Sequence, residues 1–326
     1  MKKDILHAER TLAVLEILKE ETDPDHLLSM PDLLLRLQER GIETERKAVY
    51  ASLKALNHAG FETVFVRKKY LQGYYLCRPF SPAEILILKD LIFQSVSLSE
   101  KETMRIADLL DGLLSKAQAE ALPVFRSSLA DQKTDNSEVI SVLEHAIKAI
   151  GERRYLDFRY YDLSVTRTRQ YRRNAKIYHL LPVAVMSELG RFYIVFYSPK
   201  YENFANYRAD RMSSVAFSEE ISDPVRFEEE AWQRHTFQMF AGEASTITLE
   251  CPLSLISQIY DQFGKNLIIS RLTDTSFTVH VRSALTPTLV SWILTFYREI
   301  TVTKPQELID ELPNISEVLE KKYRVK

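Results

Sequence analysis

Basic and aromatic side chains alternate along residues 153–217, and their types suit the binding of a polyanion. From Arg153 to Lys176 there are eight Lys/Arg residues and two acidic ones, Asp157 and Asp162. Guanidinium groups bind phosphate through paired hydrogen bonds, and tyrosine rings can stack on a base. A solvated basic face is the alternative explanation. The pattern makes a nucleotide or a single-stranded nucleic acid the first candidate ligand.

The charge of the chain is distributed unevenly, although its net value is only -2 over 326 residues. Residues 148–215 hold 13 Lys/Arg against 6 Asp/Glu, whereas residues 216–326 hold 11 against 16. The basic segment is therefore an internal feature that an acidic C-terminal part offsets. The length predicts two or three domains.

No constellation of residues indicates an enzyme or a cofactor. The seven histidines are scattered, and no pair of them has metal-ligand spacing. The sequence has no glycine-rich phosphate loop and no GxSxG or HExxH motif. We therefore expect a protein that is not an enzyme and that needs no metal or cofactor.

Four features of the basic segment, taken together, resemble the WYL domain of bacterial transcription regulators. They are FRYYD at 158–162, YHLLPVAV at 178–185, the triplet FYI at 192–194 and YRADR at 207–211. The triplet keeps only the tyrosine of the family's name, since Phe and Ile replace Trp and Leu. The resemblance implies an Sm-like or SH3-like barrel over residues 151–218 that senses a nucleotide or a nucleic-acid signal. The short alternating strands independently predict a small, strongly bent sheet.

The resemblance and the chemistry together single out six ligand-binding candidates in this barrel. They are Tyr160, Tyr178, His179, Tyr193, Arg208 and Arg211. Structural roles compete with this interpretation: Tyr193 suits a barrel core, and Asp210 can pair with Arg211 to close a turn. For His179, a plain core or surface histidine competes with a ligand contact.

Residues 1–78 have the pattern of a winged helix-turn-helix. Helices are predicted at 5–21, at 30–40 and from a Thr44 cap to Gly60. Two short strands, 61–66 and 74–77, flank a basic turn and complete a hairpin. The order resembles the DeoR-like winged domain that precedes WYL domains, and the third helix resembles its recognition helix.

Such a helix enters the major groove of DNA, so its basic residues are predicted to bind a double-stranded operator. The predicted DNA-binding residues are Thr44, Arg46, Lys47, Tyr50, Lys54, Arg67, Lys68 and Lys69. Arg46, Lys47 and Tyr50 are assigned to the groove and the others to the backbone. Glu45 argues against close phosphate packing at the helix start. A module used only for protein contacts is the alternative.

Residues 79–150 are predicted to form a helical linker that also packs against a second subunit. Capping signals at Ser81 and Ser99 predict helices to about Gln94 and Ala119. A polar connection at 131–137 leads to a further helix, 138–150, which is expected to stop at Gly151.

After an acidic connection at 219–230, the chain from Ser245 reads strand, helix, strand, strand, helix, then a final strand and helix, which predicts a ferredoxin-like α+β domain over residues 219–326. The order resembles the C-terminal extension called WCX. The fold class is therefore α+β and multidomain, with domains 1–78, 79–150, 151–218 and 219–326.

Nothing in the sequence predicts a secretory signal or a membrane span, and the two cysteines, Cys77 and Cys251, lack redox or metal spacing. We expect a cytoplasmic, homodimeric, ligand-responsive transcription regulator. The alternative comes from the same resemblance: a WYL accessory factor of a phage-defence or CRISPR system that binds RNA or modulates a nuclease.

Overall fold

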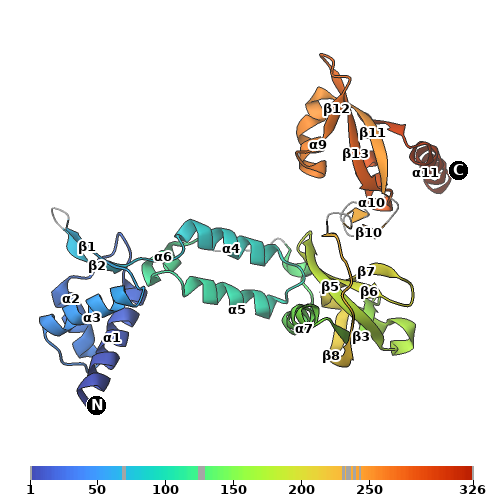
Figure 1. The fold of residues 1–326 in the computed structure, drawn as a ribbon. Helices are drawn as coiled ribbons and strands as arrows, with labels where there is room; N and C mark the ends of the chain where they lie inside the picture. Colours follow the sequence, from blue (N-terminus) through green and yellow to red (C-terminus); the bar gives the residue numbers. More distant parts are fainter. Residues whose placement is uncertain are drawn as a thin grey trace. The chain divides into compact units, whose positions relative to one another are not determined.

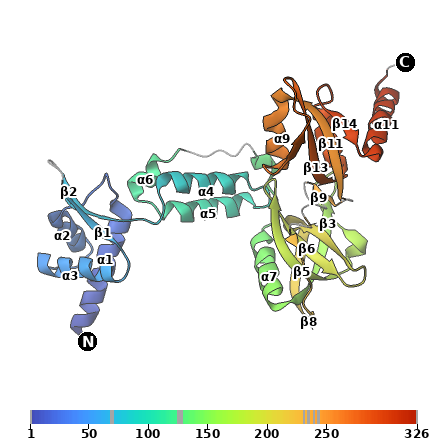
Figure 2. The same cartoon turned by 45° about the horizontal axis from the view of Figure 1, so that its top comes forward.

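The structure, a computed structural model, describes residues 2–67, 71–123, 129–229, 232, 236–237, 240–241 and 244–324. Its contacts divide the chain into two compact units, residues 1–140 and 141–326. Each unit combines helices with antiparallel sheet (Figures 1 and 2), which confirms a mixed α+β, multidomain chain. The four domain ranges given by the sequence analysis stay predictions.

The first unit begins with a helix–hairpin module, residues 2–78. Its elements are α1 (Lys2–Glu21), α2 (Met30–Glu39), α3 (Arg46–His58), β1 (Thr63–Arg67) and β2 (Gln72–Leu76). The buried stripes of the three helices, which include Val14, Leu33 and Val49, share one apolar core with Leu76 of β2. This packing turns the polar side of α3 outward.

The ends of α3 differ in how well the sequence predicted them. Gly60 follows the helix with φ +90°, as expected for a glycine that ends a helix. The predicted Thr44 cap is wrong, because Glu45 occupies the N-cap and makes no side-chain cap hydrogen bond. A cap needs a short side chain at the residue directly before the helix, and Thr44 lies one position too early.

Three helices follow the module: α4 (Pro82–Gln94), α5 (Glu100–Asp111) and α6 (Lys116–Ala121). Ser81, Ser99 and Ser115 each close a capping box at a helix start. The single helix expected from Ser99 to Ala119 is therefore two helices. The chain turns after Gly112, and Ser115 starts the second helix.

The first unit also contains a short 3-10 turn, η1 (Ala130–Gln132), which leads into a buried lysine contact. Lys133 Nζ donates to Ser95 O at 2.7 Å and to Thr103 Oγ1 at 2.9 Å. These bonds hold the polar connection against the α4–α5 hairpin.

The second unit opens with α7 (Val139–Glu152), which runs through Gly151 rather than stopping there, and continues into a curled antiparallel sheet. The strands are β3 (Arg154–Leu163), β4 (Arg169–Tyr171), β5 (Tyr178–Glu188), β6 (Arg191–Ser198), β7 (Asn203–Arg208) and β8 (Met212–Ile221). Their order is β4-β3-β5-β6-β7, and β8 pairs with β3 outside this path. The short 3-10 turns η2 (Arg172–Ala175) and η3 (Ala209–Arg211) join strands.

The sheet bends where its ladders are interrupted. The register between β5 and β6 shifts between Pro182 and Ala184, at a residue that has no N–H to give to the ladder. Two further shifts interrupt the pairing of β3 with β8. Phe158, Ile194 and Phe196 fill the interior and are almost fully buried.

The rest of the second unit forms a separate sheet with helices. After the short hairpin β9 (Thr236–Phe237) and β10 (Phe240–Ala241), the elements are β11 (Ala244–Pro252), η4 (Leu253–Leu255), α9 (Ile256–Phe263), β12 (Ile268–Ser270), β13 (Ser276–Ala284), α10 (Pro287–Thr295), β14 (Thr301–Lys304) and α11 (Gln306–Tyr323). The sheet order is β12-β13-β11-β14, and all neighbours are antiparallel. The element order expected from the sequence is confirmed. Among the described residues, no helix is long and apolar enough to cross a membrane.

Candidate functional site

The outer face of α3 is exposed and basic. Val49 and Leu56 face inward, and Arg10 Nε of α1 donates to Ser52 Oγ at 3.1 Å, which fixes the inner side of the helix. Lys47 and Lys54 lie on the opposite side and are exposed. A helix with one side packed and the other open can present the open side to a partner.

The cations of α3 have no internal counter-ions. Within the described part of the chain, Arg46, Lys47 and Lys54 form no ion pair, and α3 contains no acidic residue. The arginines of α2 differ, since Arg36 pairs with Glu21 and Glu39, and Arg40 pairs with two glutamates of α1. The exposed face of α3 therefore keeps its positive charge, whereas the charges of Arg36 and Arg40 are neutralised.

Tyr50 links α3 to the hairpin. Burial raises the pKa of Tyr74 on β2 to about 12, and the neighbouring Tyr50, as a charge and as a hydrogen-bond partner, adds to the rise. Tyr74 also packs against Phe65, with ring centroids 4.8 Å apart. Tyr50 remains 47% exposed, so it borders the basic face while fixing the hairpin beside it.

Two of the other predicted DNA-binding residues, Thr44 and Arg67, lie among the described residues. Thr44 is half-buried just before α3, and Arg67 is exposed at the end of β1 without an ion pair among the described residues. Lys68 and Lys69 lie outside the described residues, so their predicted contacts are untested.

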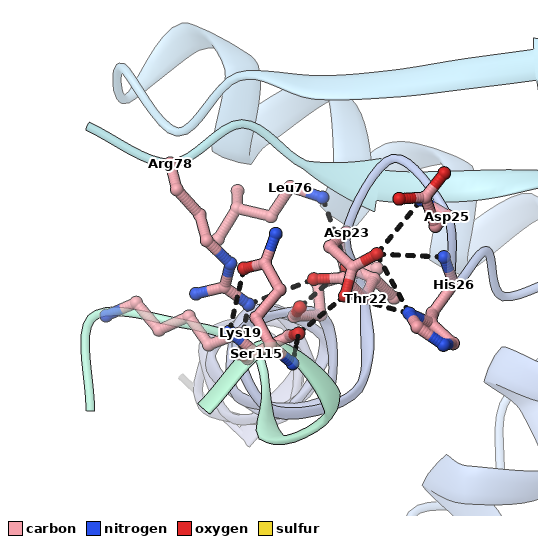
Figure 3. Close-up of polar contacts among 10 residues, drawn as sticks. Lys19, Thr22, Asp23, Asp25, His26, Leu76, Arg78 and Ser115 are labelled. Atoms are coloured by element: carbon pink, nitrogen blue, oxygen red, sulfur yellow. Dashed lines mark hydrogen bonds and ion pairs between the residues drawn. The ribbon is translucent and has the colours of Figure 1, made fainter. Parts of the chain in front are cut away.

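A buried polar joint connects the helix–hairpin module to α6 (Figure 3). The Asp23 side chain is 1% exposed, accepts a 2.5 Å hydrogen bond from Ser115 Oγ, and pairs with His26 at 2.9 Å. Burial acts to raise the pKa of Asp23, but hydrogen bonds from Ser115, Asp25 and His26 outweigh it and lower the pKa. The carboxylate therefore stays charged inside the joint.

Arg78 forms the second half of the joint. Its Nη2 donates to the carbonyls of Lys19 and Thr22, and its Nη1 donates to Leu113 O at 3.2 Å. Leu76 N donates to Thr22 Oγ1 at 3.1 Å. These bonds tie the end of α1, the end of β2 and the turn between α5 and α6 to one another.

In the curled sheet, two of the predicted ligand-binding tyrosines are core residues. Tyr160 and Tyr178 are each 6% exposed, and their rings pack with each other and with Tyr207. Tyr178 also stacks on Phe158. The Tyr160 hydroxyl accepts a hydrogen bond from Arg208 N at 3.2 Å. The Tyr160 ring thus supports the sheet and offers no free face for stacking on a base.

The predicted arginines belong to an arginine–aspartate cluster (Arg172, Arg208, Arg211, Asp162 and Asp210). Arg208 binds Asp210 through two bonds, Nε to Oδ1 at 3.0 Å and Nη2 to Oδ2 at 2.6 Å. Asp162 accepts from Arg172 at 2.6 Å and from Arg211 at 2.7 Å, and the Arg172 hydrogen bond is the main cause of its lowered pKa. Both predicted guanidiniums are therefore largely neutralised by internal carboxylates.

Arg191, which the sequence analysis did not select, adds a cation beside this cluster. Burial and the nearby Arg208 lower its pKa, while Asp210 opposes the shift. Tyr193, half-buried, lies opposite Arg208 in the β6–β7 ladder, two residues from Arg191. Arg191 lies on the same face of β6 as Tyr193. The period-2 alternation of this strand could therefore have identified Arg191 from the sequence.

A second feature of the sheet is a hollow of about 340 Å³, the tyrosine pocket. Its wall includes Arg173, Tyr178, His179, Lys200, Tyr201 and Tyr207, and no carboxylate lines it. The Arg173 guanidinium carbon lies 4.7 Å from the Tyr178 ring centre, and Lys200 Nζ lies 5.2 Å from that of Tyr201. Aromatic rings with cations at their edge match the chemistry of a nucleotide.

His179, in the wall of this pocket, is held by two carboxylates. Its Nδ1 lies 2.7 Å from Asp157 Oδ1, and its Nε2 lies 3.1 Å from Glu220 Oε2. Its ring stacks on Tyr155 with centroids 4.7 Å apart. Both nitrogens already have partners, so His179 can contact a ligand only through the face of its ring.

The turn that carries Arg173 is strained. Arg173, Asn174 and Ala175 have φ values of 52°, 54° and 60°, the left-handed region that residues other than glycine rarely occupy. Each such residue costs of order 1–3 kcal/mol, and strained backbone clusters at binding sites. This turn carries the Arg173 guanidinium that lies against the Tyr178 ring in the wall of the tyrosine pocket.

Metal and thiol chemistry have no site in the described residues. No group of three or more His, Cys, Asp or Glu side chains there could hold a metal ion. Cys77 and Cys251 are unpaired, and burial raises the pKa of Cys251 to about 11, which keeps that thiol protonated.

Comparison with known proteins identifies one domain. Residues 141–217 match the WYL domain, so a WYL domain is present, and it takes in most of α7 as well as the curled sheet. Among solved structures, the chain is similar to the proteasome accessory factor B/C (PafBC) of Arthrobacter aurescens. The identity is 16% and the TM-score is 0.29, with 97% of this chain and 49% of that chain covered. This chain thus spans about half the length of that protein. No curated protein matches.

Proposed function

We propose that this protein is a transcription regulator that binds duplex DNA through residues 2–78 and a small effector through its WYL domain. The observation that carries the proposal is the outer face of α3, where Arg46, Lys47 and Lys54 are exposed and have no internal ion pair among the described residues. Three helices followed by a hairpin are the elements of a winged helix-turn-helix, whose recognition helix enters the major groove.

The charges of α3 fit this role physically. Lysines that meet phosphates displace bound counter-ions, so binding weakens as salt rises. Lys47 and Lys54 are seven residues apart, two helical turns, and project from one side of α3. Tyr50, in contact with Tyr74, fixes the hairpin beside that side, so helix and hairpin would approach a duplex together.

The experiment is a duplex-binding titration by fluorescence anisotropy at several salt concentrations. Lys54→Ala should weaken binding to all duplex sequences and lower the slope of log K against log salt by about one unit. Lys265→Ala, at an exposed lysine of the C-terminal region, is the matched control. An unchanged slope for Lys54→Ala would remove α3 as the DNA-binding helix.

The effector site that the geometry favours is the tyrosine pocket. Arg173 and Lys200 have no carboxylate partner among the described residues, whereas Arg208 and Arg211 do. The pocket accepts a planar ring against tyrosines and a phosphate at its cationic edge. A nucleotide or one unit of a single strand has both parts.

The C-terminal sheet completes the proposed architecture. The order β12-β13-β11-β14, with α9 and α10 as connections, supports the proposal that this part is a ferredoxin-like domain and a WCX extension. A nucleic-acid binding experiment distinguishes the accessory-factor alternative from the regulator. The alternative predicts that single-stranded RNA binds and that duplex DNA fails to bind under any salt condition.

A further inference from the structure

The α4–α5 hairpin carries more exposed apolar surface than a solvated linker would. Only Ile85 of α4 is buried, while Ile87 and Leu91 are each 59% exposed. On α5, Met104 is 47% exposed and Leu109 is 62% exposed. A helix that is apolar around most of its circumference is normally covered.

The exposed face of α5 also carries two charges without partners. Met104, Arg105, Asp108 and Leu109 lie within about 140° of the helix circumference, at 100° per residue. All four side chains are exposed. Among the described residues, neither Arg105 nor Asp108 has an ion pair.

We propose that α5 packs antiparallel against α5 of a second copy of this chain, about a two-fold axis level with the midpoint between Arg105 and Asp108. In that register Arg105 faces the partner's Asp108, and Met104 faces the partner's Leu109. A two-fold contact repeats each pair, since residue i meets j and j meets i. The face is therefore complementary to itself in charge and in apolar surface.

The self-complementarity is what selects a second copy as the occupant. An unrelated partner would have to supply an acid and a base at matching positions, whereas a second copy supplies them by symmetry. A helix of 12 residues is about 18 Å long. Two such helices alone would bury less area than the roughly 1,600 Å² of a standard interface. The apolar side chains of α4 therefore contribute to the same dimer.

The register leads to a charge-swap experiment on the full-length chain without DNA. Arg105→Asp leaves two acids on each face, and Asp108→Arg leaves two bases. In a dimer of either variant alone, like charges face each other at both symmetry-related positions. The dimer dissociation constant of each variant should therefore rise about tenfold or more. An equimolar mixture of the two variants should recover the dimer, because the two acids on the face of one chain then meet the two arginines on the face of the other.

Sedimentation equilibrium measures the masses, with Lys265→Asp as the control for a charge reversal elsewhere and circular dichroism as the control for folding. Recovery of the dimer in the mixture supports the register. A monomeric wild-type chain, or a dimer that none of the substitutions weakens, overturns it. The proposed DNA-binding function is not needed for the dimer itself. It gives the dimer its consequence, which is that two copies of α3 are presented to a two-fold operator. Because no DNA is present, the dimer can fail while duplex binding succeeds, or the reverse.

Discussion

At the scale of single residues, what decides a role is whether a charge already has a partner. Arg173 and Arg208 are both arginines of the WYL domain, yet Arg208 donates twice to Asp210, whose side chain is 5% exposed. Arg173 instead lies over a tyrosine ring at the edge of a pocket. The first arginine is positioned to stabilise the domain, and the second belongs to the proposed effector site.

We therefore predict opposite effects of two alanine substitutions. Arg208→Ala removes both hydrogen bonds between the guanidinium and the buried Asp210 carboxylate and should destabilise the domain by about 3 kcal/mol. Arg173→Ala should leave stability nearly unchanged and weaken binding of a short single-stranded oligothymidylate about tenfold. Urea unfolding followed by tryptophan fluorescence reports on this unit, because Trp232 and Trp292 both lie in it.

The double variant Arg208→Ala/Asp210→Ala is the matched control for that prediction. It removes both charges and should lose less stability than Arg208→Ala alone. If Arg208→Ala proves stable but no longer binds the oligonucleotide, the ligand site lies at the arginine–aspartate cluster instead.

The sequence predicted which residue types make up this site, but it did not predict which of these residues pair with one another. The tyrosines and arginines of residues 153–217 were selected from the resemblance and from their chemistry, and the WYL domain is present. The pairing depends on β3 bringing Asp162 beside Arg211, which lies 49 positions away. Nothing in local periodicity encodes such a contact. The sequence analysis weighed a pair between Asp210 and Arg211, whereas Asp210 binds Arg208 and Asp162 binds Arg211. Arg173 was not among the six candidates, because a strained turn has no local signature in the sequence.

At the scale of elements, the β1–β2 hairpin is positioned by a close backbone approach. Leu28 and Tyr74 exchange backbone hydrogen bonds of 3.1 and 2.8 Å, so β2 lies directly against the segment before α2. A Cβ added at Gly73 would come within 2.6 Å of Leu28 O. Only glycine permits this approach.

We predict that Gly73→Ala displaces the hairpin from the helices. The backbone has to move, which should cost about 1–3 kcal/mol, and Tyr74 would lose its contact with Tyr50. Thermal unfolding by circular dichroism measures the cost, and duplex binding should weaken in parallel. Gly151→Ala is the control, since a Cβ there meets nothing within 4 Å and alanine favours the helix. Equal stability of both variants would contradict the close approach.

The elements themselves were largely predictable, because helix and strand signals are local. The capping boxes at Ser81 and Ser99 start helices where expected, and the strand–helix order after residue 244 is present. The wrong prediction of one helix from Ser99 to Ala119 also has a local cause. Ser115 starts α6 with Gln118 as its capping partner, a weaker signal than Glu, and the run of apolar residues before it concealed the break.

At the scale of the whole molecule, the proposed regulator needs its two binding functions to be coupled in free energy. An effector changes the affinity for DNA only if it binds the DNA-competent and incompetent forms with different affinity. The joint around Asp23 and Arg78 ties the helix–hairpin module to the α5–α6 turn, so these parts would move as one body. An effector would then act on α3 through the linker helices rather than through the joint.

We predict that a single-stranded oligothymidylate that occupies the tyrosine pocket shifts duplex affinity by about 5–150-fold, a coupling of about 1–3 kcal/mol. Linkage requires that the duplex shift oligothymidylate affinity by the same factor, and anisotropy with each nucleic acid labelled in turn measures both. Direct competition between the oligonucleotide and the duplex for α3 would also lower duplex affinity. The Arg173→Ala variant distinguishes this competition from coupling. If coupling runs from the pocket, this variant loses the effect while keeping duplex affinity. If the oligonucleotide still displaces the duplex from Arg173→Ala, both ligands share α3 and the WYL domain is no sensor.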